Sequence, residues 1–256
     1  MRLLPISRFS ILAIAVFLFF SCTKTTEEFK TASLNDYYPL NPGKFIAYRL
    51  DSTVFTNFGR TTEIHSYQVK HLIESKITDN LNRPSYRVFR YLRDTAGIQP
   101  WSQAGSYFIT PLSDQVELIE DNLRFIKMHL PIKNKFSWKG NTYLPSDPYV
   151  SKYIFSNDDN IEDWDFKYDG ESSSFSYGGK NYTDVYNIEE VNEATNVPIT
   201  VPTAYASKSR AVEKYSKNIG LVYREYELWE YQPNPSGSGG PFKTGFGVRM
   251  WMIDHN

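Results

Sequence analysis

Hydrophobic and polar residues alternate with a period of two over much of the chain beyond residue 40. The apolar residues on one face of the first such run are Ile46, Tyr48, Leu50 and Val54. Those on one face of the last run are Phe246, Val248, Met250 and Met252. Two further runs, 86–93 and 221–231, carry aromatic rings on both faces. A period of two is typical of antiparallel strands that bury one face, so the pattern predicts a β-rich domain.

Turn-forming residues separate these runs, as a series of hairpins requires. The pair Gly178-Gly179 stands between two strand-like segments, and both glycines accept the positive φ of a two-residue hairpin turn. The segment 232–243 is rich in Pro, Gly and Ser, which predicts a flexible loop between the last two strands.

One segment, 207–218, shows helical spacing. Ala211, Val212 and Tyr215 follow this spacing, and Gly220 comes next as a stop signal. Strands and helices do not alternate along the chain, which argues against a parallel sheet. We therefore predict an all-β fold: a single domain of twisted antiparallel strands, arranged as a sandwich or a partly closed barrel, with one short helix near 207–218.

The first 21 residues follow a different pattern, which indicates a cleaved signal peptide. Arg2 and Arg8 give a positive start, and an apolar stretch extends from Phe9 to Phe20. A stretch of about a dozen residues is too short for a transmembrane helix, which needs about 20, and has the length of a secretory signal. Ser21 follows this stretch, and the next residue is Cys22, the single cysteine of the chain.

The residues around this cysteine resemble the lipobox of a bacterial lipoprotein precursor. The lipobox-like segment is Leu18-Phe19-Phe20-Ser21-Cys22, and it is followed by Lys24 and Glu27-Glu28, as in lipoproteins of the Bacteroidota. The segment 38–48 (YPLNPGKFIAY) is similar to the start of the β domain in many uncharacterised Bacteroidota outer-membrane lipoproteins. The resemblance implies that the Cys22 thiol receives diacylglycerol, that the signal is cut before it, and that the new amino group is acylated, for example with palmitate.

The same resemblance implies an outer-membrane location with a lipid anchor. Residue 23 is Thr rather than Asp, which favours sorting to the outer membrane. Glu27 and Glu28 lie slightly late for the Bacteroidota surface-export signal, so the periplasmic face and the cell surface both stay open. We expect three segments: the signal peptide over 1–21, a lipidated N-terminus and flexible tether over 22–35, and the antiparallel β domain over 36–256.

Composition narrows the classes of partner. The chain has 256 residues with a formal net charge of −1, which becomes −3 once Arg2 and Arg8 leave with the signal. Such a charge provides no basic face for nucleic acid, and one cysteine cannot form an internal disulfide. The expected partners are the membrane, through acyl groups on Cys22, and an envelope protein or a glycan; no nucleic acid is expected.

Motifs for catalysis and metal binding are weak. His65 and His71 share a strand face but lie about 20 Å apart, so they cannot bind one ion. Asp158, Asn160 and Glu162 alternate as in a calcium loop, but the glycine turn and the closing Glu of that loop are missing. We keep these three as a weak calcium candidate and otherwise predict no metal, no cofactor and no catalytic residue.

Aromatic residues make up 16% of the chain. Five of them lie in or near Gly-, Pro- or Asp-rich segments: Trp101, Tyr107, Trp138, Tyr143 and Trp164. Rings at strand ends can form a stacking platform for a ligand such as a sugar, and rings that close the rim of a β core produce the same pattern. Both interpretations stand at this point.

The sequence favours a membrane-anchored envelope lipoprotein that acts as a non-enzymatic binding or assembly module. One alternative is a carrier with an aromatic-lined cavity for a lipid or glycan, which requires a continuous cavity of several hundred Å³. The other is a carboxylate-dependent hydrolase that uses acids of the stretch 158–169, which requires two carboxylates facing each other across a cleft.

Overall fold

The computed structural model describes residues 31–153, 160–234 and 239–256. The predicted signal peptide, Cys22 and most of the predicted tether lie outside these ranges, and so does Asp158. Among the helices of the described ranges, none has the length and apolar character needed to cross a membrane.

Strands dominate the described part of the chain. They are β1 (Phe45–Thr56), β2 (Thr61–Thr78), β3 (Pro84–Asp94), β4 (Ser102–Pro111), β5 (Gln115–Glu120), β6 (Leu123–His129), β7 (Ser137–Lys139), β8 (Asp165–Tyr168), β9 (Ser173–Tyr177), β10 (Lys180–Thr195), β11 (Ala206–Ser216), β12 (Gly220–Gln232) and β13 (Phe242–His255). The helical elements described are α2 (Leu34–Tyr37) and the 3-10 helix η2 (Ile161–Asp163). The predicted all-β fold is confirmed.

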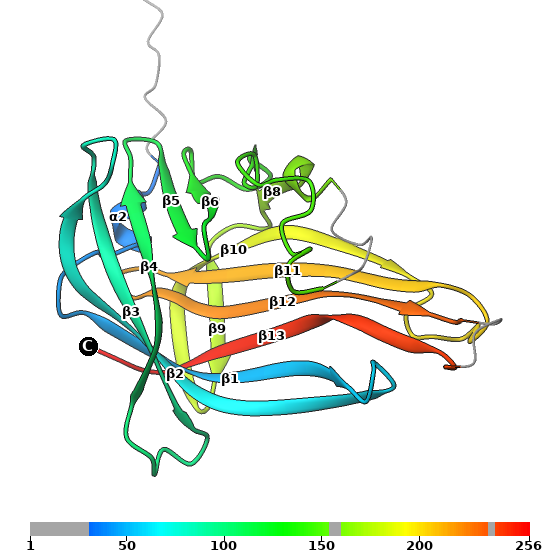
Figure 1. Cartoon of the computed structure of the whole chain (residues 1–256). Coiled ribbons are helices and arrows are strands. Elements are labelled where there is room, and N and C mark those ends of the chain that lie inside the picture. The colour runs from blue at the N-terminus through cyan, green and yellow to red at the C-terminus, as the bar shows by residue number, and fades with distance from the viewer. Residues whose placement is uncertain (1–30, 154–159, 235–238) are drawn as a thin grey trace, which may run out of the picture. The chain divides into compact units, whose positions relative to one another are not determined.

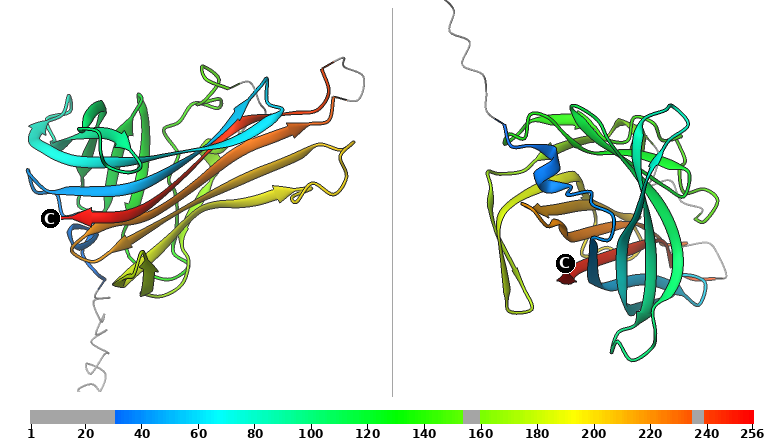
Figure 2. Two further views of the ribbon diagram at one scale, coloured as in Figure 1. Left: turned by 90° about the horizontal axis from the view of Figure 1, so that it is seen from below. Right: turned by 90° about the vertical axis from the view of Figure 1, so that its left-hand side faces the viewer.

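The strands pair antiparallel in one continuous sheet, in the order β6-β5-β4-β3-β2-β1-β13-β12-β11-β10-β8-β7, and β9 pairs with β10. In Figure 1 the long strands β1, β2 and β10–β13 run side by side, while β3–β6 curve away from one end of them. Figure 2 shows the same sheet curling round an interior.

The two ends of this strand order meet, which nearly closes the sheet into a barrel. Ile126 of β6 donates its backbone N–H to the carbonyl of Gly140, just after β7, at 2.7 Å. The indole N–H of Trp138 in β7 donates to the carbonyl of Ile126 at 2.9 Å. Of the two predicted arrangements, the partly closed barrel is therefore the one adopted.

β-Bulges bend the long strands and change which side chains face inward. In β10, Glu189 pairs with Val212 and Val191 pairs with Ala211, so Glu190 is an extra residue in the ladder. Glu190 is only 3% exposed, and its carboxylate meets a buried lysine across the interior.

The predicted apolar rows of β1 and β13 face the interior and form the main core. Tyr48 pairs with Met252, and both are buried together with Met250. Val69 of β2 and Val88 of β3 belong to the same core cluster. A second, smaller cluster of Leu144, Ile161 and Leu228 attaches the segment that follows β7 to the inner face of β12.

The short helix α2 belongs to the folded domain and shortens the predicted tether. Leu34 and Tyr37 are buried in the main core. The Thr31 hydroxyl accepts a hydrogen bond from the backbone N–H of Ile132 at 2.8 Å. Residues 31–35, which the sequence assigned to the tether, therefore pack with the β domain.

The helix predicted near 207–218 is wrong, because this segment forms β11. Ala211 and Tyr215 are four residues apart, a spacing that fits both a helix and every second residue of a strand. Glu213, between them, is charged but buried, so the alternation was hidden in the sequence. Pairing with β10 on one side and β12 on the other decides in favour of a strand.

The hairpin predicted at Gly178-Gly179 is confirmed. Tyr177 pairs with Lys180, and the two glycines between them have φ of 59° and 77°. A two-residue turn with both φ values positive matches the twist of the strands it joins.

Candidate functional site

The interior of the barrel contains a cavity of about 480 Å³. Inward-facing residues of β1–β6, β12 and β13 line it. One wall is apolar and includes Leu50, Val69, Val248 and Met250. Aromatic rings also line it: Phe125, Tyr149, Tyr153, Tyr226 and Phe246. Ligand sites typically measure about 300–1,000 Å³ and combine apolar walls with a few polar groups.

A smaller pocket of about 70 Å³ adjoins this cavity, and we call the boundary between the two the neck. The neck consists of the four residues that line both spaces: His71, Leu118, Glu120 and Arg224. Beyond the neck the small pocket is mainly apolar and extends to the residues that follow α2, including Leu40.

An open groove of about 650 Å³ between the β1–β2 turn and the start of β13 also adjoins the cavity. Lys152, Tyr153 and Phe246 line both the cavity and the groove. The three spaces therefore adjoin one another, with charged groups at the neck and an apolar wall along the cavity.

Three buried charged residues and the partly exposed Arg224 cross the interior. Lys127 of β6 places its Nζ 2.6 Å from Glu190 Oε1 and 3.3 Å from Glu213 Oε1. Arg224 of β12 donates from Nε to Glu213 Oε1 at 2.7 Å, and its Nη2 lies 2.6 Å from the same oxygen. These ion pairs connect opposite walls of the barrel, and each charge has a partner, as burial demands.

The two buried carboxyl groups differ in proton affinity. Burial raises the pKa of Glu190, Lys127 only partly offsets this, and the nearby Glu213 carboxylate raises it further. Burial alone would also raise the pKa of Glu213, but Arg224 and Lys127 outweigh it and lower the pKa to about 2. Glu213 is therefore ionised at any ordinary pH, whereas Glu190 holds its proton more readily.

His71 stands at the neck in its neutral form. Burial lowers its pKa to about 3, with further lowering from Arg224 and Arg90. Its Nδ1 lies 3.0 Å from the Tyr107 hydroxyl. The neutral ring offers one donor and one acceptor, so it can fix the orientation of a polar group without adding charge.

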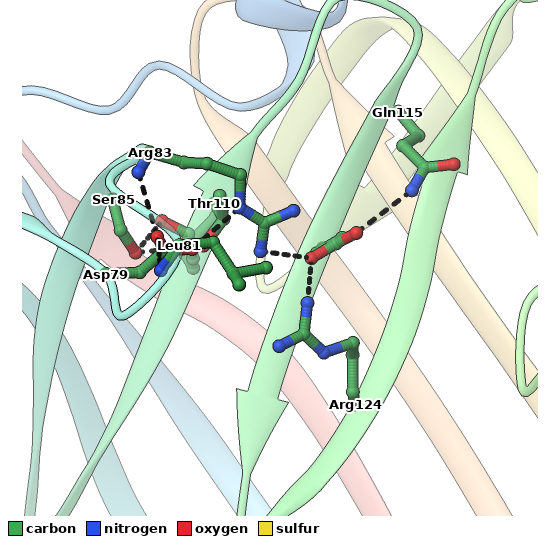
Figure 3. Close-up of polar contacts among 9 residues, drawn as sticks. Asp79, Leu81, Arg83, Ser85, Thr110, Gln115 and Arg124 are labelled. Carbon is green, nitrogen blue, oxygen red and sulfur yellow. Dashed lines mark hydrogen bonds and ion pairs between the residues drawn. The ribbon is translucent and has the colours of Figure 1, made fainter. Parts of the chain in front are cut away.

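A second charged cluster lies on the outer face of β5 and β6 (Figure 3). The Glu117 carboxylate accepts from Arg83 at 3.0 Å, from Gln115 at 3.1 Å and also from Arg124. Arg83 in turn donates to Asp79 of the β2–β3 turn at 2.7 Å. Because Glu117 is only 2% exposed and accepts three hydrogen bonds, this cluster joins the turn to the sheet and leaves no open ligand position on the carboxylate.

The five predicted platform rings lie at separate places. Tyr107 faces the small pocket, and Trp138 is buried in the core against Phe166 and Tyr168. Trp164 packs near Tyr226.

The remaining two rings interact with outer-face cations. The Arg93 guanidinium lies 4.1 Å from the centre of the Trp101 ring. Tyr143 is 54% exposed, with Arg124 5.7 Å from its ring centre. The rings that surround the main cavity are different ones, contributed by β6, β12, β13 and the segment after β7.

The weak calcium candidate can be placed only in part, because Asp158 lies outside the described residues. Asn160 has a φ of 59° and directly precedes η2, whose second residue is Glu162. In the described ranges no three His, Cys, Asp or Glu side chains are grouped as a metal site would require.

The charged cluster of the interior, of which Lys127 and Arg224 line the cavity, was missed in the sequence. Its signal is a charge among apolar residues: Lys127 is flanked by Ile126 and Met128, and Glu213 stands in the alternate row between Ala211 and Tyr215. A buried charge at an inward-facing strand position is unusual, since it needs a partner from another strand.

No protein-family model matches the chain, and no curated protein matches it. One similar solved structure is a Bacteroides fragilis protein described as a candidate exported protein with a YmcC-like fold; it is 10% identical, covers 84% of this chain and 97% of its own, and has a TM-score of 0.32. Another is a DUF1329 family protein from Desulfovibrio piger, 10% identical over 86% of this chain and 88% of its own, with a TM-score of 0.19. At these scores neither likeness carries an argument about fold, ligand or location.

Proposed function

We propose that this chain is a lipid-anchored lipoprotein of the bacterial outer membrane that binds an amphipathic small molecule inside its barrel, without catalysis. The cavity of about 480 Å³ carries this proposal. A packed interior would have left no room for a ligand. Here apolar walls, five aromatic rings and the charged side chains of Lys127 and Arg224 face one cavity. Among the hypotheses from the sequence, this arrangement favours the carrier over the assembly module.

The location rests on the sequence. The signal-like residues 1–21, the lipobox-like segment and Cys22 support membrane anchoring through acyl chains. An anchored protein with an internal apolar cavity is suited to hold a molecule that is poorly soluble in water, such as a lipid or a lipid-linked glycan.

A cavity-filling substitution tests the binding role. Val248 lines the cavity, whereas its neighbour Arg249 points outward and forms ion pairs with Glu225 and Glu227 on the opposite face of β13. Val248→Trp should abolish saturable binding of a dansylated fatty acid, followed by fluorescence, whereas Arg249→Trp should leave binding unchanged. Both variants must unfold cooperatively near the wild-type temperature. Equal binding by the wild type and Val248→Trp would refute a site in the cavity.

A further inference from the structure

At the neck of the cavity, part of the Arg224 guanidinium makes no hydrogen bond to the described residues. Both Nε and Nη2 of Arg224 contact a single oxygen of Glu213. Its Nη1 has no hydrogen-bond partner among the described residues, although the side chain lines both the cavity and the small pocket. A guanidinium has five N–H donors in a rigid fork, so the unused side can bind a planar acceptor such as a carboxylate, or a phosphate.

Both carboxylates beside Arg224 already accept hydrogen bonds. Glu213 accepts from Arg224 through Oε1, which also lies 3.3 Å from Lys127 Nζ, and from the Tyr215 hydroxyl through Oε2 at 2.6 Å. Glu120, the other carboxylate at the neck, accepts from Arg90. A ligand group placed here would therefore meet a surplus of donors, which favours a group that only accepts.

The local charge points the same way. Burial and the neighbouring Glu213 raise the pKa of Glu190, while Glu213 stays ionised. The cations Arg90, Lys127 and Arg224 face the carboxyl groups of Glu120, Glu190 and Glu213 here. Each proton held by Glu190 therefore leaves an excess of positive charge. Within the barrel, away from bulk water, such an excess attracts an anion more strongly than it would at an exposed surface.

An apolar path begins at the same place. Leu50 of β1 and Val248 of β13 line the cavity. Phe246 of β13 lines both the cavity and the open groove. We propose that Arg224 binds the anionic group, a carboxylate or a phosphate, of an amphipathic ligand whose apolar chain lies along Leu50, Val248 and Phe246. This inference rests on the proposed function, because it names the chemical class that the cavity selects.

Paired probes test the inference. The full lipoprotein is held in amphipol and titrated with two dansylated probes. One is a fatty acid, and the other is the fatty alcohol of the same chain length. A charge-assisted hydrogen bond to the partly buried Arg224 guanidinium should make the acid bind about ten- to a hundredfold more tightly than the alcohol. Equal affinities in the wild type would overturn the inference.

The decisive variant removes a pair of opposite charges: Glu213→Gln with Arg224→Gln. It leaves the net charge unchanged and should bind acid and alcohol equally, with the alcohol affinity of the wild type. The matched control, Glu225→Gln with Arg249→Gln, removes an outer-face pair whose atoms are 2.9 Å apart and should keep the preference for the acid. A preference that survives the inner double substitution would overturn the role of Arg224.

A competition experiment distinguishes a carboxylate from a phosphate as the anionic group of the ligand. An alkyl phosphate and an unlabelled fatty acid are each used to displace the dansylated acid, and displacement by either supports the inference, with the stronger competitor identifying the head group. Failure of both to displace it would overturn the inference. Failure of the proposed function looks different: neither dansylated probe then binds saturably.

Discussion

Lys127 is the side chain on which the interior charges depend. It is 5% exposed and lies within ion-pair distance of two buried carboxylates, Glu190 and Glu213. Removing one member of a buried ion-pair network leaves the others without compensation, which is far more costly than loss of a surface pair.

We therefore expect Lys127→Met to lower the free energy of unfolding by about 3–5 kcal/mol. The matched control is Lys152→Met, because Lys152 pairs with Asp121 with both side chains 57% exposed. That substitution should cost less than about 1 kcal/mol. Urea denaturation measures both, and similar losses would show that the buried cluster contributes nothing special.

His71 makes stability depend on pH. Its pKa falls from 6.5 to about 3 on folding, so between these values the unfolded chain binds a proton that the folded chain does not. Stability gained from the neutral ring is complete above pH 6.5 and decreases as the pH falls toward about 3.

Below pH 6.5, the ordinary pKa of histidine, the free energy of unfolding should fall by up to about 1.4 kcal/mol for each pH unit, and measurements from about pH 7 to about pH 5 cover the onset of this loss. His71→Gln should remove this part of the slope, because glutamine does not titrate. Denaturation curves at several pH values compare the two proteins. An unchanged slope in the variant would mean that His71 titrates normally in the folded barrel.

At the scale of the element, the pairing of β12 with β13 depends on a close backbone approach. Gly245 has a φ of +111°, and a Cβ there would come 2.2 Å from the Leu228 carbonyl oxygen. Gly179 also has a positive φ, +77°, but a Cβ there would have no neighbour within 4 Å.

Gly245→Ala should therefore destabilise the protein clearly more than Gly179→Ala, which carries only the cost of the backbone conformation, about 1 kcal/mol. Thermal unfolding gives the comparison. If both alanines shift the melting temperature equally, the strands can separate at Gly245 without cost.

The elements also show what the sequence could and could not predict. The apolar row 246–252 showed correctly which face of β13 is inside, and the turn at 178–179 follows from its residues alone. Lys127 and Glu213 were misleading, because a charge in a strand indicates a solvent-facing position unless its partner is known. Those partners come from distant strands, and Glu190 enters the interior through a bulge that no local pattern predicts. The cavity was therefore only one hypothesis among three.

At the scale of the whole molecule, the anchor remains a prediction from the sequence. Cys22→Ala should move the protein from the membrane fraction to the soluble fraction, because the acylated thiol would be lost. Thr23→Ala, which leaves the cysteine in place, is the matched control and should stay in membranes. Cell fractionation with immunoblotting measures both, and membrane retention of Cys22→Ala would contradict lipidation.

The position of β13 between β1 and β12 sets an order of events during synthesis. The Lys44 ammonium donates a hydrogen bond to the backbone carbonyl of Asn256, 212 residues later. The middle of the sheet therefore joins a segment made early in translation to one made at its end. β2 to β6 can pair as hairpins while the chain is still emerging, and so can β10 to β12. Apart from the contacts of Ile126 with Gly140 and Trp138, β13 is the element that joins these two groups in the described sheet, so the barrel is incomplete until residues 242–255 have been made. Until then the apolar wall of the cavity is exposed, and if the chain is exported as proposed, a chaperone of the envelope would have to cover it.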